Sequence, residues 1–409
     1  MERPPLRHAL RALGPGLVAG ASDTDPTTVA AVAVIGATTV FGLAWLALLI
    51  APALIVVQVI ATRLGVIGGT DLPTAARARF RPAVQHTIAL SIVAVTVLTL
   101  AADLSAGAAA IGLLAGIGAS WLVAPLAAVI AMLLVVGTSS GVVRVLKYLT
   151  LVLLAYAVSA ALTDVSWAHV LHHSFVPSFS LTHDDIAGAL ALVGTTITSY
   201  VFVWQTVELA QQRRTADRLA SAETDAAFGI VFAVVIIWFI LVATGATLGV
   251  HHQQVQTAQD AARALRPLAG DAASTVFGLG LLGSALIAVP VLMSTAAYVV
   301  GAEFDWRRGL SEPVSRAPRF YAALLVTSAA AVLVTLLQVS AIQLLFYASI
   351  AGGIGTPVAL GCMLVLAGDP TVMRGRPIGA ALRTAGWVVT ATMGLMSGLY
   401  VLDQLGAFR

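Results

Sequence analysis

The amino-acid sequence predicts an all-α membrane protein that crosses the bilayer many times, and three observations lead to this prediction. The chain has 409 residues, of which 59% are hydrophobic and only 10% are charged, with a mean hydropathy of +0.95. Soluble domains carry about 25% charged residues, so most of this surface must face lipid. Long apolar stretches recur along the whole chain, and two of them are interrupted by polar residues at corresponding places in the two halves.

A membrane-spanning helix needs roughly 20 apolar residues, and eleven stretches meet this requirement. The predicted spans are 14–38, 42–64, 84–110, 121–137, 144–163, 184–212, 222–249, 271–301, 318–337, 339–366 and 378–402. We interpret residues 14–163 and 184–366 as two inverted repeats of five spans, with 378–402 as an additional helix. All of them belong to a single membrane domain, residues 1–409.

The basic residues predict the orientation of these spans. Cytoplasmic loops of membrane proteins carry an excess of Lys and Arg. When the N-terminus is placed inside, only Arg263, Arg266 and Arg409 of the 22 basic residues fall outside. We therefore expect an inner-membrane protein with a cytoplasmic N-terminus and an external C-terminus. The same distribution explains the sequence pI near 9.3 without a nucleic-acid partner.

Two carboxylates, Asp23 and Asp25, stand next to Pro26 in the middle of the first span. An acid at the bilayer centre costs roughly 2.5–3.5 kcal/mol, so it requires a partner or a function. Proline removes a backbone donor and disfavours a helical conformation at the preceding residue, which predicts a break here. Carboxylates, freed carbonyls and hydroxyls together form an all-oxygen site suited to a hard cation. A helix N-cap is the alternative for each acid.

The sixth span contains a second polar stretch, Gly194–Tyr200, in which most residues are small or carry a hydroxyl. Thr and Ser loosen a helix through β-branching and backbone hydrogen bonds. A small-residue packing face is the alternative interpretation. The two breaks lie five spans apart, so inverted repeats would bring them together at the midplane. Paired interruptions of this kind are the best sequence indication of a transport site.

Other residues add weaker indications. Asp103 lies within the third span, where it either faces a water-filled cavity or pairs locally. We expect Glu303 and Asp305 to form an interfacial ion pair with Arg307. Cys362 is the single cysteine and lies in an apolar span, so no disulfide forms within the chain.

Histidines are absent from the predicted span interiors, which argues against a membrane-embedded histidine proton relay. Six of the eight fall in predicted outward loops, where a solvated loop is favoured over metal collection. These six are His169, His172, His173, His183, His251 and His252. Neither a phosphate-binding loop nor a catalytic motif is present, so we expect no enzyme activity, no ATP-driven step and no cofactor.

Several of these segments together resemble one known family. They are Gly14–Leu17, Asp23–Pro26, Phe41–Trp45, Ala102–Leu104, Gly194–Ile197 with Tyr200, Trp204 and Gln205, Ala288–Leu292 and Trp306–Leu310. The chain resembles the natural resistance-associated macrophage protein (Nramp) metal transporters, and is most similar to the Nramp-related magnesium transporters. The resemblance implies a leucine-transporter-type fold with eleven spans, and divalent-cation uptake at a site between the first and sixth helices.

The resemblance also implies roles for individual residues. Asp25 stands at the position of the family's metal-binding Asp, and Thr28 at that of a coordinating Asn. Thr195 and Thr198 stand where other Nramp members place Ala and a selectivity Met, and Tyr200 where they place a proton-linked His. We predict a cation site and a transport pathway from these positions. The cation site comprises Asp23, Asp25, Thr28, Thr195 and Thr198, and Asp103, Tyr200 and Gln205 line the pathway.

The chain also departs from the magnesium-type pattern. Thr24 replaces the middle acid of the first-span triplet, Thr28 replaces a glycine, and Ser199 replaces the sixth-span proline. One acid fewer weakens the attraction for a divalent ion, and the added hydroxyls compensate in part.

The sequence therefore predicts a transporter of Mg²⁺ or Mn²⁺ that the membrane potential drives. The alternative is transport of an organic solute such as an amino acid on the same fold. Such sites direct half-helix N-termini at a substrate carboxylate, which two acids in the first break would repel. An intramembrane enzyme is disfavoured because the predicted span interiors contain no His and no Cys other than Cys362, and a non-transporting scaffold stays open.

Overall fold

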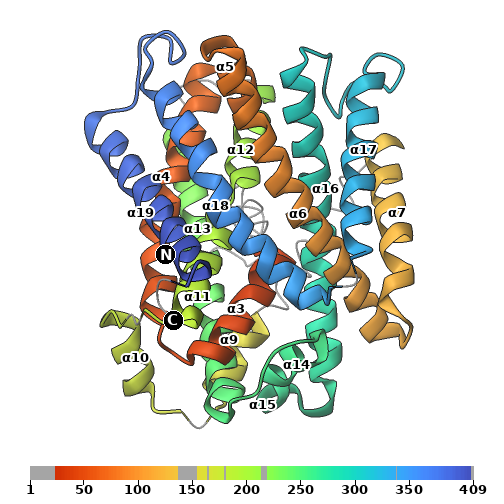
Figure 1. Ribbon diagram of the computed structural model, residues 1–409, viewed down its shortest axis with the longest axis vertical. Helices are drawn as coiled ribbons and strands as arrows, with labels where there is room; N and C mark the ends of the chain where they lie inside the picture. Colours follow the sequence, from red (N-terminus) through yellow and green to blue (C-terminus); the bar gives the residue numbers. More distant parts are fainter. Residues whose placement is uncertain are drawn as a thin grey trace, which may run out of the picture.

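A computed structural model of the chain describes residues 24–136, 154–163, 165–178, 181–212, 219–337 and 339–406. The regular structure of these residues is entirely helical, and most helices run along one common direction as a bundle (Figure 1). Asp23 and the first parts of the first and fifth predicted spans lie outside the described residues.

The long helices occupy the predicted spans. Nine apolar segments of the described residues are long enough to cross a bilayer, and α3 is a shorter apolar helix. The main helices are α3 (Pro26–Thr39), α4 (Ala44–Arg63), α6 (Pro82–Ala115), α7 (Val123–Val136), α9 (Leu154–Ala161), α11 (His183–Thr196), α12 (Ser199–Gln211), α13 (Leu219–Thr247), α16 (Ala273–Glu303), α17 (Pro318–Thr335), α18 (Ala341–Gly368) and α19 (Ala380–Gln404).

Short helices lie between these spans, at the two ends of the bundle (Figure 1). A π-helical turn (Leu64–Gly68) and α5 (Leu72–Arg79) lie at one end, which we call the α5 end. The opposite end, the α10 end, holds α10 (Trp167–Phe175), α14 (Ala258–Ala262) and α15 (Arg266–Ala269).

Helices α11 and α12 lie in the middle of the bundle, while α19 lies at its periphery (Figure 1). Helix α3 packs on α13 and α11, and α6 packs on α16 and α18. Glycine permits the close approach of α3 to α13. A Cβ atom at Gly36 of α3 would lie 2.7 Å from the carbonyl oxygen of Leu241 in α13. This packing holds α3 and α11 side by side in the interior, where the two breaks lie.

The described basic residues gather at the α5 end, apart from Arg263 and Arg266 at the α10 end. Those at the α5 end are Arg63, Arg77, Arg79, Arg81, Arg307, Arg308, Arg316, Arg319, Arg374, Arg376 and Arg383. This asymmetry in three dimensions agrees with the loop assignment made from the sequence.

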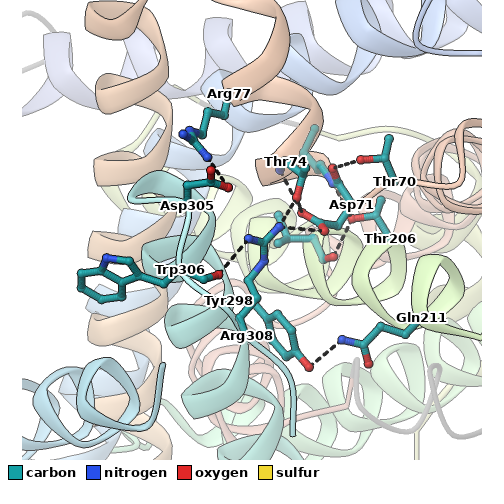
Figure 2. A network of polar contacts seen from close by, with 12 residues as sticks. Thr70, Asp71, Thr74, Arg77, Thr206, Gln211, Tyr298, Asp305, Trp306 and Arg308 are labelled. Atoms are coloured by element: carbon teal, nitrogen blue, oxygen red, sulfur yellow. Dashed lines mark hydrogen bonds and ion pairs between the residues drawn. The ribbon is translucent and has the colours of Figure 1, made fainter. Parts of the chain in front are cut away.

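Ion pairs tie α5 to the segment that follows α16 (Figure 2). Arg308 contacts the Thr74 hydroxyl and lies 3.5 Å from Asp71, whose side chain also caps α5 by accepting from the Thr74 N–H. Arg77 pairs with Asp305 at 2.5 Å. These contacts join two connections that are more than 200 residues apart in the sequence.

Helix α12 is attached to the same network (Figure 2). Gln211, at its last turn, donates from Nε2 to the Tyr298 hydroxyl of α16 at 2.6 Å. The Leu72 N–H donates to the Thr206 hydroxyl at 3.0 Å. The α5-end network of Asp71, Thr74, Arg77, Thr206, Gln211, Tyr298, Asp305 and Arg308 thus connects α5, α12 and α16.

The predicted pairing of Glu303 and Asp305 with Arg307 is wrong. Asp305 instead pairs with Arg77, Glu303 contacts His86 of α6, and Arg307 pairs with Glu312 at 3.0 Å. Sequence proximity suggested the local pair, but the acids at the end of α16 face the neighbouring helices. At the same end of the bundle, hydrogen bonding from Arg79 lowers the pKa of Asp369 below its ordinary value.

Candidate functional site

The first break lies where the sequence predicts it. Helix α3 begins at Pro26, and Asp25 has an extended backbone (φ −70°, ψ 169°). The Asp25 Oδ1 atom accepts from the Thr28 N–H at 2.7 Å, so the N-cap interpretation correctly describes one oxygen of this side chain. The carbonyl oxygen of Thr24 accepts a hydrogen bond of 2.6 Å from the Ser284 hydroxyl of α16. Helix α16 therefore holds the non-helical backbone before α3 in place.

The second break separates α11 from α12. Helix α11 ends at Thr196 and α12 begins at Ser199, with Ile197 and Thr198 between them. The Ser199 N–H, which lacks an intrahelical partner at this helix start, donates to the Thr356 hydroxyl of α18 at 3.1 Å. The hydroxyl-rich stretch is thus an interruption of the sixth span. Its first residue, Gly194, also packs closely against Gly353 of α18, so the packing-face alternative describes that end of the stretch.

The two breaks meet inside the bundle. The Tyr200 hydroxyl donates to Asp25 Oδ2 at 2.7 Å. The hydroxyl oxygens of Thr28 and Thr195 lie 3.0 Å apart, and the Thr28 hydroxyl also donates to the Thr195 carbonyl at 3.4 Å. Asp25 is only 2% exposed. Four of the predicted site residues, Asp25, Thr28, Thr195 and Tyr200, are therefore brought together.

The remaining predicted residues lie at different distances from this centre. The Thr198 hydroxyl donates to the Thr195 carbonyl at 3.4 Å, so it borders the break but turns back on its own segment. Gln205 donates from Nε2 to the Thr62 hydroxyl at 2.8 Å, and so joins α12 to α4 away from the break. Asp23 lies outside the described residues.

Asp103 of α6 is fully buried beside the first break. Its Oδ1 atom accepts from the Thr27 N–H at 3.1 Å and from the Thr27 hydroxyl at 2.6 Å. The sequence left a cavity and local pairing open, and pairing describes this oxygen. The Oδ2 atom has no hydrogen-bond partner among the described residues. Asp25 and Asp103 thus both accept from the first turn of α3, where the helix dipole favours negative charge.

The combined site contains only oxygen donors at its centre. Around the first turn of α3 lie the carboxylates of Asp25 and Asp103, the hydroxyls of Thr27, Thr28 and Thr195, and the Thr195 carbonyl. Neither acid is ion-paired to a described Lys or Arg. The described residues contain no cluster of three His, Cys, Asp or Glu side chains. Such a site suits a hard cation that keeps part of its water shell.

Sequence reasoning missed three residues that support this site. Ser284 holds the Thr24 carbonyl, Thr27 binds Asp103, and Thr356 caps α12. Thr27 stood within the first break, and Thr356 precedes a proline inside a span, so each carried a weak signal. Ser284 had none, because it is one small residue among many in its helix.

Buried, interrupted helices that meet from opposite halves of an all-α bundle define this chain as a leucine-transporter-type membrane protein. The sequence model described as "Natural resistance-associated macrophage protein-like" (Nramp) matches residues 16–403. The chain belongs to this family, as its sequence resemblance predicted.

Similar proteins are known by sequence and by structure. The Divalent metal cation transporter MntH of Ralstonia nicotianae is 31% identical over 304 residues, covering 69% of this chain and 67% of the relative. The protein of the same name from Deinococcus radiodurans is 27% identical over 417 residues, covering 98% and 92%.

The solved structures share the fold at lower identity. The crystal structure of an Eremococcus coleocola manganese transporter has a TM-score of 0.74 and 18% identity, covering 100% of this chain and 90% of that one. The structure of MhsT in complex with L-phenylalanine has a TM-score of 0.64 and 14% identity, covering 96% and 98%. The predicted fold class is confirmed by these neighbours.

Proposed function

We propose that this chain carries divalent metal cations across the membrane, with Mn²⁺ as the first candidate. The curated relatives are named as divalent metal cation transporters, and the similar Eremococcus coleocola protein is a manganese transporter. The Mg²⁺ expectation has no separate support from these names, so Mg²⁺ takes second place.

The observation that carries the proposal is the meeting of Asp25, Thr28 and Thr195 at the two breaks. Adjacent oxygens in an octahedral shell with metal–oxygen bonds of about 2.1 Å lie about 3 Å apart. The hydroxyl oxygens of Thr28 and Thr195 have this spacing, at 3.0 Å. Each Asp25 oxygen has two lone pairs, so it can ligate a cation while it keeps its hydrogen bond. The cation would bind between α3 and α11, with water completing its shell.

The charge of the site supports a cation over an organic acid. Asp25 and Asp103 both border the first turn of α3, and the described residues offer no basic partner for either. A substrate carboxylate would be repelled here. The structural likeness to MhsT extends to the fold alone, so amino-acid transport has no specific observation in its favour.

The direction and driving force follow from the distribution of charge. We place the α5 end in the cytoplasm because most basic residues lie there. One charge that crosses 100 mV gains about 2.3 kcal/mol, so a divalent ion gains roughly twice as much, enough for about a thousandfold accumulation. The membrane potential alone then suffices for uptake.

The test is uptake of Mn²⁺, Mg²⁺ and a mixture of amino acids into proteoliposomes with an imposed potential. We expect saturable Mn²⁺ uptake by the wild type and none by Asp25→Ala. Asp271→Asn, which changes an exposed acid of the α10 end, is the matched control and should transport normally. Wild-type uptake by Asp25→Ala, or uptake of amino acids without metal, would overturn the proposal.

A further inference from the structure

Helix α10 carries three histidines on a surface far from the two breaks. His169 and His173 are four residues apart, so they lie on one face of the helix. Their ring centroids are 4.2 Å apart, and the centroids of His172 and His173 are 5.4 Å apart. His169 and His172 are exposed and His173 is half-buried, so the rings are open to solvent.

The ring spacing suits a shared metal ion. A zinc-type ion bound by one nitrogen from each of two imidazoles, at about 2.1 Å, keeps the ring centroids within roughly 6.5 Å of each other. Two histidines spaced i, i+4 on a helix are a recurrent metal-binding pair for the same reason. The 4.2 Å separation of His169 and His173 lies within this limit.

The second ring nitrogen of His173 is already oriented. Its Nδ1 atom lies 3.0 Å from the carbonyl oxygen of His169. A carbonyl only accepts, so Nδ1 carries the proton, and in the neutral ring Nε2 keeps a free lone pair. Metal-binding histidines typically donate their other N–H to a carbonyl or carboxylate in this way, which fixes the tautomer and the ring.

The helix under these rings is firmly seated. Val170 is fully buried, and Ser174 accepts a hydrogen bond of 2.9 Å from the indole N–H of Trp238 in α13. Phe41, just beyond α3, packs against His169 in an edge-to-face arrangement, with ring centroids 6.0 Å apart. The histidine pair therefore stands on a positioned support and does not have to be ordered by the metal.

We propose that His169 and His173 form a second metal site, which binds borderline transition metals such as Zn²⁺, Ni²⁺ and Cu²⁺. No third His, Cys, Asp or Glu completes a cluster there among the described residues, so water fills the other positions. Imidazole nitrogen suits Zn²⁺, Ni²⁺ and Cu²⁺, whereas carboxylate and carbonyl oxygens suit Mg²⁺ and Mn²⁺. The α10 site and the site at the breaks thus differ in metal preference.

The test uses the full-length protein in detergent, purified without a polyhistidine tag, and titrates Zn²⁺ and Cu²⁺ by calorimetry. We expect His169→Ala and His173→Ala each to lower Zn²⁺ affinity by roughly tenfold or more, because each removes one of the two protein ligands, and loss of a ligand's supporting partner alone costs about 10–100-fold. His252→Ala, at another exposed histidine of the α10 end, is the matched control and should stay within about twofold of the wild type by the same comparison.

Two further measurements separate this site from the site at the breaks. In an Asp25→Ala background the histidine-dependent Zn²⁺ binding should persist, so loss of transport by that variant leaves the proposal intact. Paramagnetic resonance of bound Cu²⁺ should show coupling to imidazole nitrogen that His173→Ala removes. Unchanged Zn²⁺ affinity in both single variants, or an equal loss in His252→Ala, would overturn the site.

Discussion

Gly194 of α11 lies against the backbone of α18, directly before Thr195 of the second break. A Cβ atom added here would overlap the carbonyl oxygen of Ser349 and the amide nitrogen of Gly353, and would lie 2.7 Å from the Gly353 Cα atom. All three are backbone atoms, so no side chain can rotate away. We therefore predict that Gly194→Ala disturbs both the stability of the bundle and the site.

The size of the effect follows from these distances. Carbon atoms pack at about 3.5–4.0 Å, so α11 and α18 must separate by about 1 Å. Overpacking of this kind typically lowers the free energy of unfolding by about 1–3 kcal/mol. The higher helix propensity of Ala over Gly offsets at most about 1 kcal/mol of this loss. Because Thr195 moves with α11, the 3.0 Å contact between the Thr28 and Thr195 hydroxyls should also be lost.

Thermal unfolding in detergent and Mn²⁺ uptake in proteoliposomes measure the two consequences. We expect Gly194→Ala to unfold at a lower temperature than the wild type and to transport at least tenfold more slowly. Gly394→Ala is the control, because Gly394 lies in α19 with open space around it, and it should be neutral or slightly stabilising. Wild-type stability together with wild-type uptake in Gly194→Ala would refute the close contact.

Three further outcomes are expected. Asp103→Asn should transport better than Asp25→Ala, because Asn keeps an oxygen that accepts from Thr27. An inactive Asp103→Asn together with an active Asp25→Ala would show that the cation site is centred on α6 and not on the first break. Thr198→Met should make uptake more sensitive to competition by Cd²⁺, since a thioether is a soft ligand, and unchanged competition would show that this side chain does not face the ion. A pH dye inside vesicles at clamped potential should show no acidification in fixed ratio to Mn²⁺ uptake, because Tyr200, a hydroxyl donor to Asp25, stands where the family resemblance places a proton-linked histidine. A fixed ratio would instead assign a proton to Asp25 or Asp103.

The breaks were predictable because they depend on local chemistry. Pro26 prevents a regular helix through Asp25, and an acid in a lipid-crossing span requires compensation. Both effects act within a few residues and are visible in a single segment. Pairing of the breaks followed from the count of spans between them.

Contacts between distant segments were not predictable in the same way. Nothing in the sequence around Ser284 indicates that it binds the Thr24 carbonyl, 260 residues away. Helix ends also differed from the hydropathy estimate. The third span was predicted as 84–110, whereas α6 continues to Ala115 and stops at Gly116, whose left-handed backbone (φ 71°) ends the helix. Hydropathy measures compatibility with lipid, while the last hydrogen-bonded turn depends on capping.

The α5-end network affects how often the substrate-free protein opens at that end. A transporter that alternates between two conformations, each open at one end, keeps the two in equilibrium, and every 1.4 kcal/mol shifts their ratio tenfold. In the described shape, Gln211 joins α12 to α16 and Thr206 joins α12 to α5, and these contacts must break if the α5 end opens around α12. A few such bonds, each worth about 0.5–1.5 kcal/mol net, are enough to keep the opened form a small minority until substrate binds. Without substrate the protein would then rarely open at the α5 end. The rate of opening would depend on these polar contacts as much as on the chemistry of the bound ion.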